Sequence, residues 1–168
     1  KLTRVKQWLV HLMRSDNLPP TERAEAGRTL ARLGDPRPEV LTVNQMQFCY
    51  VPAGPFWMGA PSDTKNADEN AKPLHKVEIP YDYWISRYPV TNAQFEPFVQ
   101  AGGYNTPEFW LEAKEHGYWK HGQMTGRYES TPRARPHDFG SPYNLPNHPV
   151  VGVTWYEALA FTRWLSKK

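Results

Sequence analysis

Apolar residues near the start of the chain recur at steps of three and four positions, which is the period of an amphipathic helix. The pattern predicts a first helix that is broken over residues 15–20. A second pattern predicts a helix over residues 22–33, with Gly34 as its C-cap and Pro36 as its terminator. The recurring apolar positions are Leu2, Val5, Leu9 and Leu12 in the first helix and Ala26, Leu30 and Leu33 in the second.

These two helices predict a helical hairpin that has too few apolar residues to be stable by itself. The composition changes at residues 34–38, where glycine, aspartate and proline end the helical pattern. We therefore interpret residues 1–38 as a hairpin or linker from an upstream region. Residues 39–168 are interpreted as the first part of a second domain, with the C-terminal part missing.

Short alternating runs after residue 45 predict strands. The run over residues 51–59 contains two apolar pieces separated by Pro-Ala-Gly, which predicts a hairpin turn between them. Further strands are expected over residues 75–79 and 81–85. The polar segment over residues 60–73 is expected to be an exposed loop.

Two helix starts carry the clearest local signal in the chain. Thr91 stands three residues before Gln94, and Thr154 stands three residues before Glu157. This is the spacing of a capping box, in which each side chain satisfies a free backbone amide of the other residue. We expect helices to begin at both threonines, with the second continuing to about Lys168.

The second capped helix has an apolar surface wider than one stripe, formed by Trp155, Leu159, Phe161, Trp164 and Leu165. A helix of this kind must be covered on more than one side. Residues 47–85 offer a sheet for one side. We expect the other side to be covered by the C-terminal remainder of the same domain, as a second chain or a continuation.

The segment over residues 104–149 is aromatic, rich in proline and nearly without periodicity, and so long a loop is usually functional or structurally unusual. Its aromatic residues either staple the loop into the core or form the wall of a ligand groove. The candidate groove residues are Tyr104, Trp110, Trp119 and Tyr128.

Charge and hydropathy exclude two classes of partner. The net charge of +3 comes from 20 basic and 17 acidic residues that are scattered along the chain, whereas nucleic-acid binders carry a basic run or stripe. No apolar stretch reaches the roughly 18 to 20 residues that a membrane span needs. With no signal-peptide pattern, the expected location is cytoplasmic. The expected partner is a protein or a small molecule.

Catalytic and metal-binding residues are not predicted. The single cysteine, Cys49, lies in an apolar strand-like run and is expected to be buried and inert. His116 and His121 are five apart, which is not the spacing of two helical metal ligands. The spacing of Asp63, Asp68 and Glu69 lacks the glycine and the terminal glutamate of an EF-hand calcium loop. The cofactor stays undetermined.

Three stretches, taken in order, resemble the formylglycine-generating enzyme or sulfatase-modifying factor family. They are residues 50–59 (YVPAGPFWMG), 85–95 (ISRYPVTNAQF) and 147–158 (NHPVVGVTWYEA). The resemblance covers residues 46–165. It implies an α+β, C-type-lectin-like fold in which two helices pack on small antiparallel sheets with long loops.

The resemblance also bears on function. Family members that make formylglycine bind copper through a cysteine pair in a later half of the domain, and sulfoxide-forming members bind iron largely through histidines of an upstream helical domain. Neither set is in this chain. We therefore expect a ligand-binding or interaction module within a larger multidomain bacterial protein, a setting in which some such domains are targets of diversity-generating retroelements. The alternative is part of a metal-dependent oxidase of the formylglycine-generating or sulfoxide-synthase type, acting on a sulfur-containing substrate.

Overall fold

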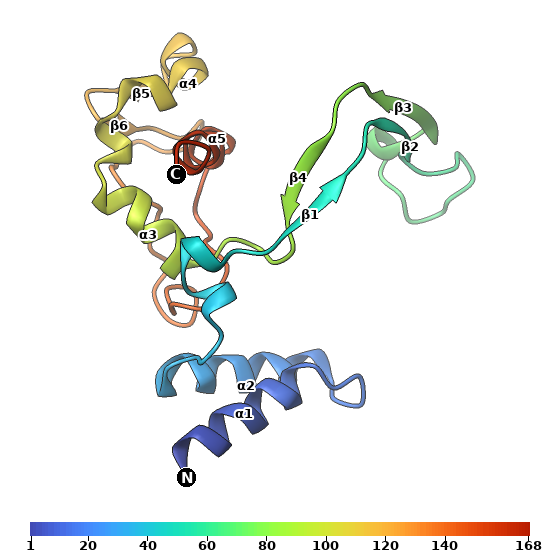
Figure 1. Ribbon diagram of the computed structural model, residues 1–168. Helices are drawn as coiled ribbons and strands as arrows, with labels where there is room; N and C mark the ends of the chain where they lie inside the picture. The colour runs from blue at the N-terminus through green and yellow to red at the C-terminus, as the bar shows by residue number, and fades with distance from the viewer. The chain divides into compact units, whose positions relative to one another are not determined.

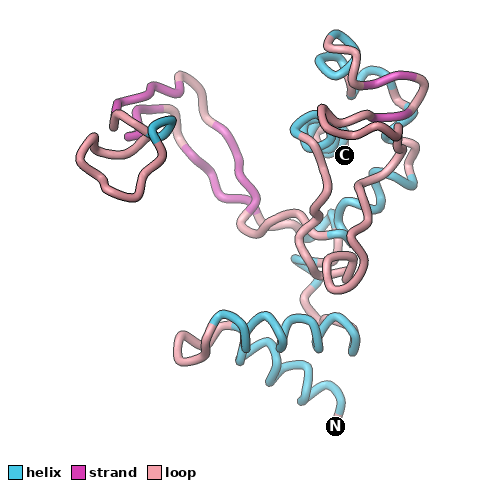
Figure 2. The backbone as a smooth tube through the Cα atoms, turned by 180° about the vertical axis from the view of Figure 1, so that it is seen from behind, coloured by secondary structure: helices cyan, strands magenta, loops and turns pink.

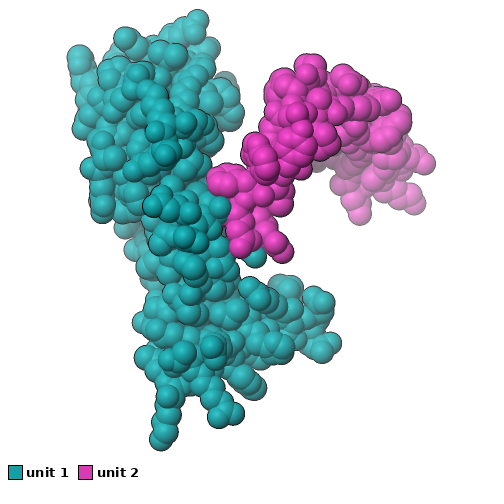
Figure 3. Space-filling view, viewed as in Figure 1, with its two compact units in different colours: residues 1–46, 88–168 teal, residues 47–87 magenta.

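The structure is a computed structural model that describes residues 1–168. Helices and small antiparallel sheets make up an α+β fold, which confirms the predicted fold class (Figure 1). The strands are confined to residues 48–86 and to a short pair within residues 119–124 (Figure 2). None of the helices combines the length and the apolar composition needed to cross a membrane. The chain divides into two compact units, residues 1–46 with 88–168 and residues 47–87 (Figure 3).

The predicted hairpin is present as α1 (Leu2–Met13) packed against α2 (Pro20–Leu33). The second helix begins earlier than expected, because Pro20 occupies the first helical position, where its missing N–H costs nothing. Ala26 and Leu30 are buried, whereas no residue of α1 is. Gly34 is the C-cap of α2, as predicted, and has a φ of +85°.

Polar contacts tie the segment after α2 to residues more than 50 positions later in the chain. The Asp35 carboxylate accepts hydrogen bonds from Arg37 and, at 2.9 Å, from Nδ2 of Asn147. The same amide donates to the Gly27 carbonyl at 3.0 Å. Two 3-10 turns, Pro38–Val40 and Val43–Gln45, follow.

Both predicted capping boxes are confirmed, at the starts of α3 (Asn92–Gln100) and α5 (Trp155–Leu165). The Thr91 amide donates to Oε1 of Gln94 at 3.1 Å, and the Gln94 amide donates back to the threonine hydroxyl at 3.3 Å. Thr154 and Glu157 repeat this pair at 2.7 and 3.3 Å.

The long segment that follows α3 is more ordered than its sequence indicates. It contains α4 (Leu111–Glu115) and the paired strands β5 (Trp119–Lys120) and β6 (Gln123–Met124). Two further 3-10 turns are Gly103–Asn105 and Pro107–Phe109.

The main core lies between α3, α5 and this segment. Phe95 of α3 stacks on Phe161 of α5 with ring centroids 5.1 Å apart, and Phe98 meets Trp164 at 5.8 Å. Residues 103–124 therefore supply part of the cover for the apolar surface of α5. The buried core residues are Phe95, Phe98, Tyr104, Phe109, Trp110, Ala113, Trp119, Met124, Ala160, Phe161 and Trp164.

The predicted hairpin turn between the two apolar pieces of residues 51–59 is wrong. These pieces are successive strands that do not pair with each other: β1 pairs with β4 and β2 with β3, both antiparallel. Asp82 spans the interruption between them, because its carboxylate accepts from the Ala53 amide at 2.7 Å and from the Tyr50 hydroxyl. The strands are β1 (Phe48–Val51), β2 (Gly54–Met58), β3 (His75–Ile79) and β4 (Tyr83–Ser86).

Cys49 is exposed, so the prediction that it is buried is also wrong. The alternation of the sequence gives β1 two distinct faces, but a two-stranded ribbon has no second layer within residues 47–87 to cover either of them. Phe48 and Tyr50, which point to the opposite face from Cys49, are likewise exposed, at 42% and 50%.

Candidate functional site

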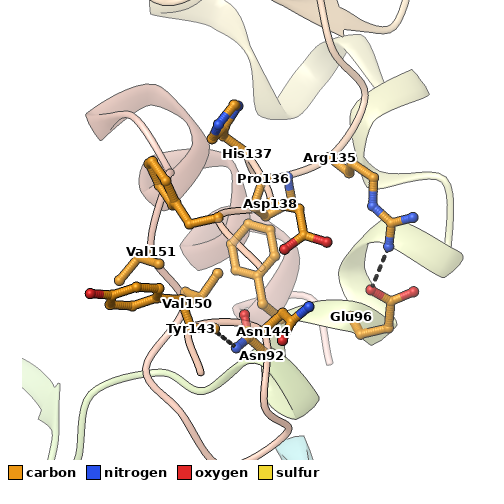
Figure 4. Close-up of a pocket in the computed structure, with 12 residues that line it drawn as sticks. Asn92, Glu96, Arg135, Pro136, His137, Asp138, Tyr143, Asn144, Val150 and Val151 are labelled. Carbon is orange, nitrogen blue, oxygen red and sulfur yellow. Dashed lines mark hydrogen bonds and ion pairs between the residues drawn. The ribbon is translucent and has the colours of Figure 1, made fainter. Parts of the chain in front are cut away.

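A pocket of about 270 Å³ lies between α3 and the segment over residues 135–151 (Figure 4). Its wall combines rings and aliphatic side chains with charged groups. The apolar lining residues are Phe95, Phe139, Tyr143, Val150 and Val151, and the polar ones include Glu96, Arg135, His137, Asp138 and Asn144.

The capping box positions the helical side of the pocket. Because it fixes the start of α3, Asn92 is the first helical residue, and its Nδ2 donates to the carbonyls of Tyr143 at 2.8 Å and Leu145 at 2.9 Å. This amide holds the later segment across the start of the helix. Phe95, one turn further on, is only 3% exposed and places an aromatic ring against the pocket.

The opposite wall is held by backbone hydrogen bonds. The Val150 amide donates to the Val90 carbonyl at 2.8 Å, and the His137 amide donates to the Gly152 carbonyl at 3.0 Å. Gly152 has a φ of +69°, and a Cβ there would lie 2.6 Å from the His137 carbonyl oxygen. Glycine is therefore required for the two segments to approach this closely.

The charged groups gather at one part of the pocket. Arg135 and Glu96 form an ion pair at 3.2 Å on the side away from Tyr143 and Val151 (Figure 4). One carboxylate oxygen of Asp138 accepts from the Gly140 amide at 2.7 Å. Carboxylate and guanidinium groups beside aromatic rings can bind a small polar molecule by hydrogen bonds and ring contacts.

A buried polar network around Glu157 and Arg133 holds the residues that precede Arg135 in the pocket wall. Glu157 is fully buried, and Arg133 donates to both of its carboxylate oxygens, with one contact at 2.8 Å. The Tyr104 hydroxyl donates to the same carboxylate. Arg133 also binds Glu129 at 3.0 Å, so the network joins α5 to the residues that lead to Arg135.

The electrostatics of the network follow from this burial. Burial and the adjacent Glu157 carboxylate raise the pKa of the Tyr104 hydroxyl well above its ordinary value. Burial alone would lower the pKa of Arg133, but its hydrogen bonds to Glu157 and Glu129 outweigh that effect and raise it. Both groups therefore keep their protons and act as permanent hydrogen-bond donors.

The four predicted groove residues do not share one surface. Tyr104, Trp110 and Trp119 are buried together, with centroids 5.0 Å apart for the first pair and 6.3 Å for the second. The indole N–H of Trp110 donates to the Gly103 carbonyl, and that of Trp119 to the Tyr104 carbonyl. Tyr128 is 90% exposed. None of the four lines the pocket at α3, although Trp119 borders a second groove.

Sequence reasoning did not identify the residues that do line the pocket. The run of Arg135, Pro136, His137 and Asp138 was the available signal, because it concentrates charged and imidazole groups in a proline-containing stretch. Its contact with α3 depends on hydrogen bonds between distant residues. One sequence does not show which part of a 46-residue segment meets that helix.

The resemblance implies copper or iron, but the residues of this chain do not form a ligand set that fits either metal. No group of three or more histidine, cysteine, aspartate or glutamate side chains is placed to hold a metal ion. The Nδ1 atom of His116 lies 2.8 Å from the Glu112 carbonyl oxygen, and that of His148 lies 2.7 Å from the Pro149 carbonyl oxygen.

Comparison with known proteins adds a family and several relatives. Residues 34–168 match the family described as "Sulfatase-modifying factor enzyme 1-like domain". The chain is 36% identical over 119 residues to the hercynine oxygenase of Mycolicibacterium smegmatis, which covers 68% of this chain and 27% of that protein. It is 28% identical over 137 residues to the formylglycine-generating enzyme of Thermomonospora curvata, covering 70% and 43%.

Another relative is named as a protein kinase and not as an oxygenase or a formylglycine-generating enzyme. The serine/threonine-protein kinase Pkn1 of Chlamydia trachomatis is 25% identical over 122 residues, covering 73% of this chain and 17% of that protein. The matched segment is thus a small part of several relatives. The chain spans about a quarter of the hercynine oxygenases, at 27% and 25% of their lengths.

Proposed function

The chain belongs to the sulfatase-modifying factor family, and from that premise we propose that it forms part of a metal-dependent oxidase or oxygenase acting on a sulfur-containing substrate. The observation that carries the proposal is the 36% identity over 119 residues to a hercynine oxygenase. The formylglycine-generating enzymes among the relatives support the same type of chemistry.

In this proposal the chain contributes scaffold and a binding wall. The capped helices and the buried Glu157 network fix the segment that ends in Arg135 and Asp138, so the charged side of the pocket is held in place before a ligand arrives. A copper or iron ion would supply activation of O₂, and its ligands would come from outside residues 1–168. The role of these residues is to bind and orient.

We further propose that more polypeptide of the same domain packs on this chain. Large apolar side chains are exposed in both units: Trp155 at the start of α5 is 65% exposed, and Trp57 of β2 is 67% exposed. Covering a side chain of this size stabilises a protein by about 1.5 to 3 kcal/mol. A second chain or a continuation of this one would fill that place.

Oxygen consumption by the full-length parent protein tests the proposed chemistry. The protein, supplied in turn with copper and with iron, is offered a cysteine-containing peptide and then hercynine with free cysteine. We expect oxygen uptake that depends on one metal and one substrate, and a product whose mass shows oxidation at sulfur or carbon. A metal-loaded, folded protein that consumes no oxygen with any of these substrates contradicts the proposal.

The binding-module function remains a second candidate, and the Pkn1 relatives favour it, because a protein named as a kinase contains a segment similar to this chain. Under this hypothesis the parent protein consumes no oxygen, yet it binds a protein or small molecule saturably at the pocket. Replacement of Asp138 by Asn should then weaken that binding while the thermal unfolding temperature stays unchanged.

A further inference from the structure

A second groove, of about 590 Å³, lies beside the turn that joins β5 to β6. Lys114 of α4 borders it, and Lys120 and His121 of the turn border it as well. Trp119 and Asn105 also contribute to the lining. No acidic side chain lines the groove, so the charged groups within its lining include two ammonium groups and no carboxylate.

The cationic groups are unpaired. Neither Lys114 nor Lys120 forms a hydrogen bond or ion pair through its side chain, and the same holds for the His121 ring. The acidic residues nearby are engaged elsewhere or lie outside the groove: Glu112 binds Arg163 and Glu108 binds Lys167. Glu115, on the same helix as Lys114, is not among the lining residues.

The turn holds its side chains in a demanding conformation. His121 has a φ of +50° and is the one non-glycine residue of the chain in the left-handed region; Gly122 follows at +79°. Two-residue hairpin turns of this kind prefer Asn or Gly, so histidine adopts this conformation at an energetic cost. A Cβ on Gly122 would lie 2.0 Å from Oδ1 of Asn105, which shows how tightly the turn packs.

The ring of Trp119 beneath the turn is buried and hydrogen-bonded. Trp119 is 7% exposed, its indole N–H donates to the Tyr104 carbonyl at 2.9 Å, and its ring stacks on Trp110. The backbone that carries Lys120 and His121 is therefore anchored to the main core. Two lysines and an imidazole reach an open groove from a fixed support.

We propose that this groove binds a small molecule carrying a phosphate monoester, held by Lys114, Lys120 and His121. Lysine binds phosphate as a point charge, and two lysines with an imidazole match a compact dianion. The groove is separate from the pocket at α3. Its function does not depend on the oxidase proposal.

Isothermal titration at low ionic strength tests this site, with inorganic phosphate and phenyl phosphate as probes. The variant K114Q/K120Q removes both ammonium groups, and K65Q/K76Q removes two exposed lysines from the 47–87 unit as the matched control. We expect saturable binding of phenyl phosphate, weakened at least about tenfold in K114Q/K120Q and changed less than about twofold in the control. Thermal unfolding of both variants should match the parent protein.

Several outcomes would overturn the proposal. They are the absence of saturable binding, an equal loss in both double variants, and binding to vesicles containing phosphatidic acid without binding to either free phosphate. A second variant, H121N, keeps a residue that accepts the left-handed conformation. This variant should weaken phenyl phosphate binding without lowering the unfolding temperature. Unchanged affinity would show that the His121 imidazole does not contact the phosphate.

Discussion

The Glu157 side chain both caps the start of α5 and forms an ion pair with Arg133. Its Oε2 accepts the Thr154 amide at 2.7 Å as part of the capping box, while both oxygens bind Arg133. Because the side chain is fully buried, removal of its charge would leave the Arg133 guanidinium without its main counter-ion. The capping box predicted the first function from sequence, whereas the arginine 24 residues earlier gave no local signal.

The variant E157Q separates these two functions, because glutamine keeps the size and the capping acceptor but loses the charge. We expect it to lower the free energy of unfolding by about 3 kcal/mol, as for other broken buried ion pairs. The control E112Q breaks the more exposed pair with Arg163 and should cost less than about 1 kcal/mol. Urea unfolding measures the free energy of unfolding of both variants. Equal losses would contradict the claim that the buried Glu157–Arg133 pair stabilises the protein more than the exposed pair does.

Asp35 gives a prediction for pH. Burial would raise its carboxyl pKa, but hydrogen bonds from Arg37 and Asn147 outweigh this and hold the pKa below the ordinary value of 3.8. A lowered pKa in the folded state stabilises the protein above the unfolded-state value, and this stabilisation is lost as the pH falls through the folded-state value. D35N should be less stable than the parent at pH 7, and the difference should shrink below pH 3.8. A constant difference in unfolding temperature down to pH 2 would contradict it.

Cys49 should react readily in the native protein, because its side chain is exposed in β1. We expect iodoacetamide at pH 8 to label it at a rate within about tenfold of that of a short unfolded peptide, because the reagent can reach an exposed side chain. Mass spectrometry follows the labelling. Protection of more than a hundredfold would show that the ribbon is covered in solution.

The capped helices show which elements a single sequence can predict. Both starts were predicted correctly because a capping box is contained within four residues. The pairing of β1 with β4 was not predicted, because the Pro-Ala-Gly turn signal over residues 52–54 is local whereas Asp82, which spans the interruption, lies about 30 residues away. The pocket at α3 escaped prediction for the same reason, since Asn92 binds carbonyls more than 50 residues away.

The two caps should differ in energy. Replacement of Thr154 by Ala removes one hydrogen bond and should cost about 1 kcal/mol of unfolding free energy. Replacement of Thr91 by Ala should cost about 2 kcal/mol, because its buried hydroxyl also donates to the Val40 carbonyl at 2.7 Å. The serine variants at each position keep the hydroxyl and serve as controls in urea unfolding. An equal cost at both positions would mean that the Val40 contact contributes nothing.

For the molecule as a whole, the decisive feature is that aromatic side chains from residues 103–124 lie in the main core. The sequence left two alternatives open for their aromatic side chains, and the structure buries Tyr104, Trp110 and Trp119 against α3 and α5. None of these three rings lines the small pocket at residues 135–151, and among them only Trp119 borders the basic groove at the β5–β6 turn. Both lie on a scaffold fixed by the same core.

Amide hydrogen exchange, resolved by NMR, tests this feature most directly. Tyr118, Met124 and Thr125 donate their amides to the carbonyls of Ala113, Arg133 and Tyr118 at 2.7, 2.7 and 2.8 Å. If the segment is part of the core, these amides will exchange as slowly as those in the middle of α5, since one cooperative opening exposes them all. Exchange at the rate of an unstructured peptide, while the α5 amides stay protected, would show that the segment is a mobile loop and would contradict the account.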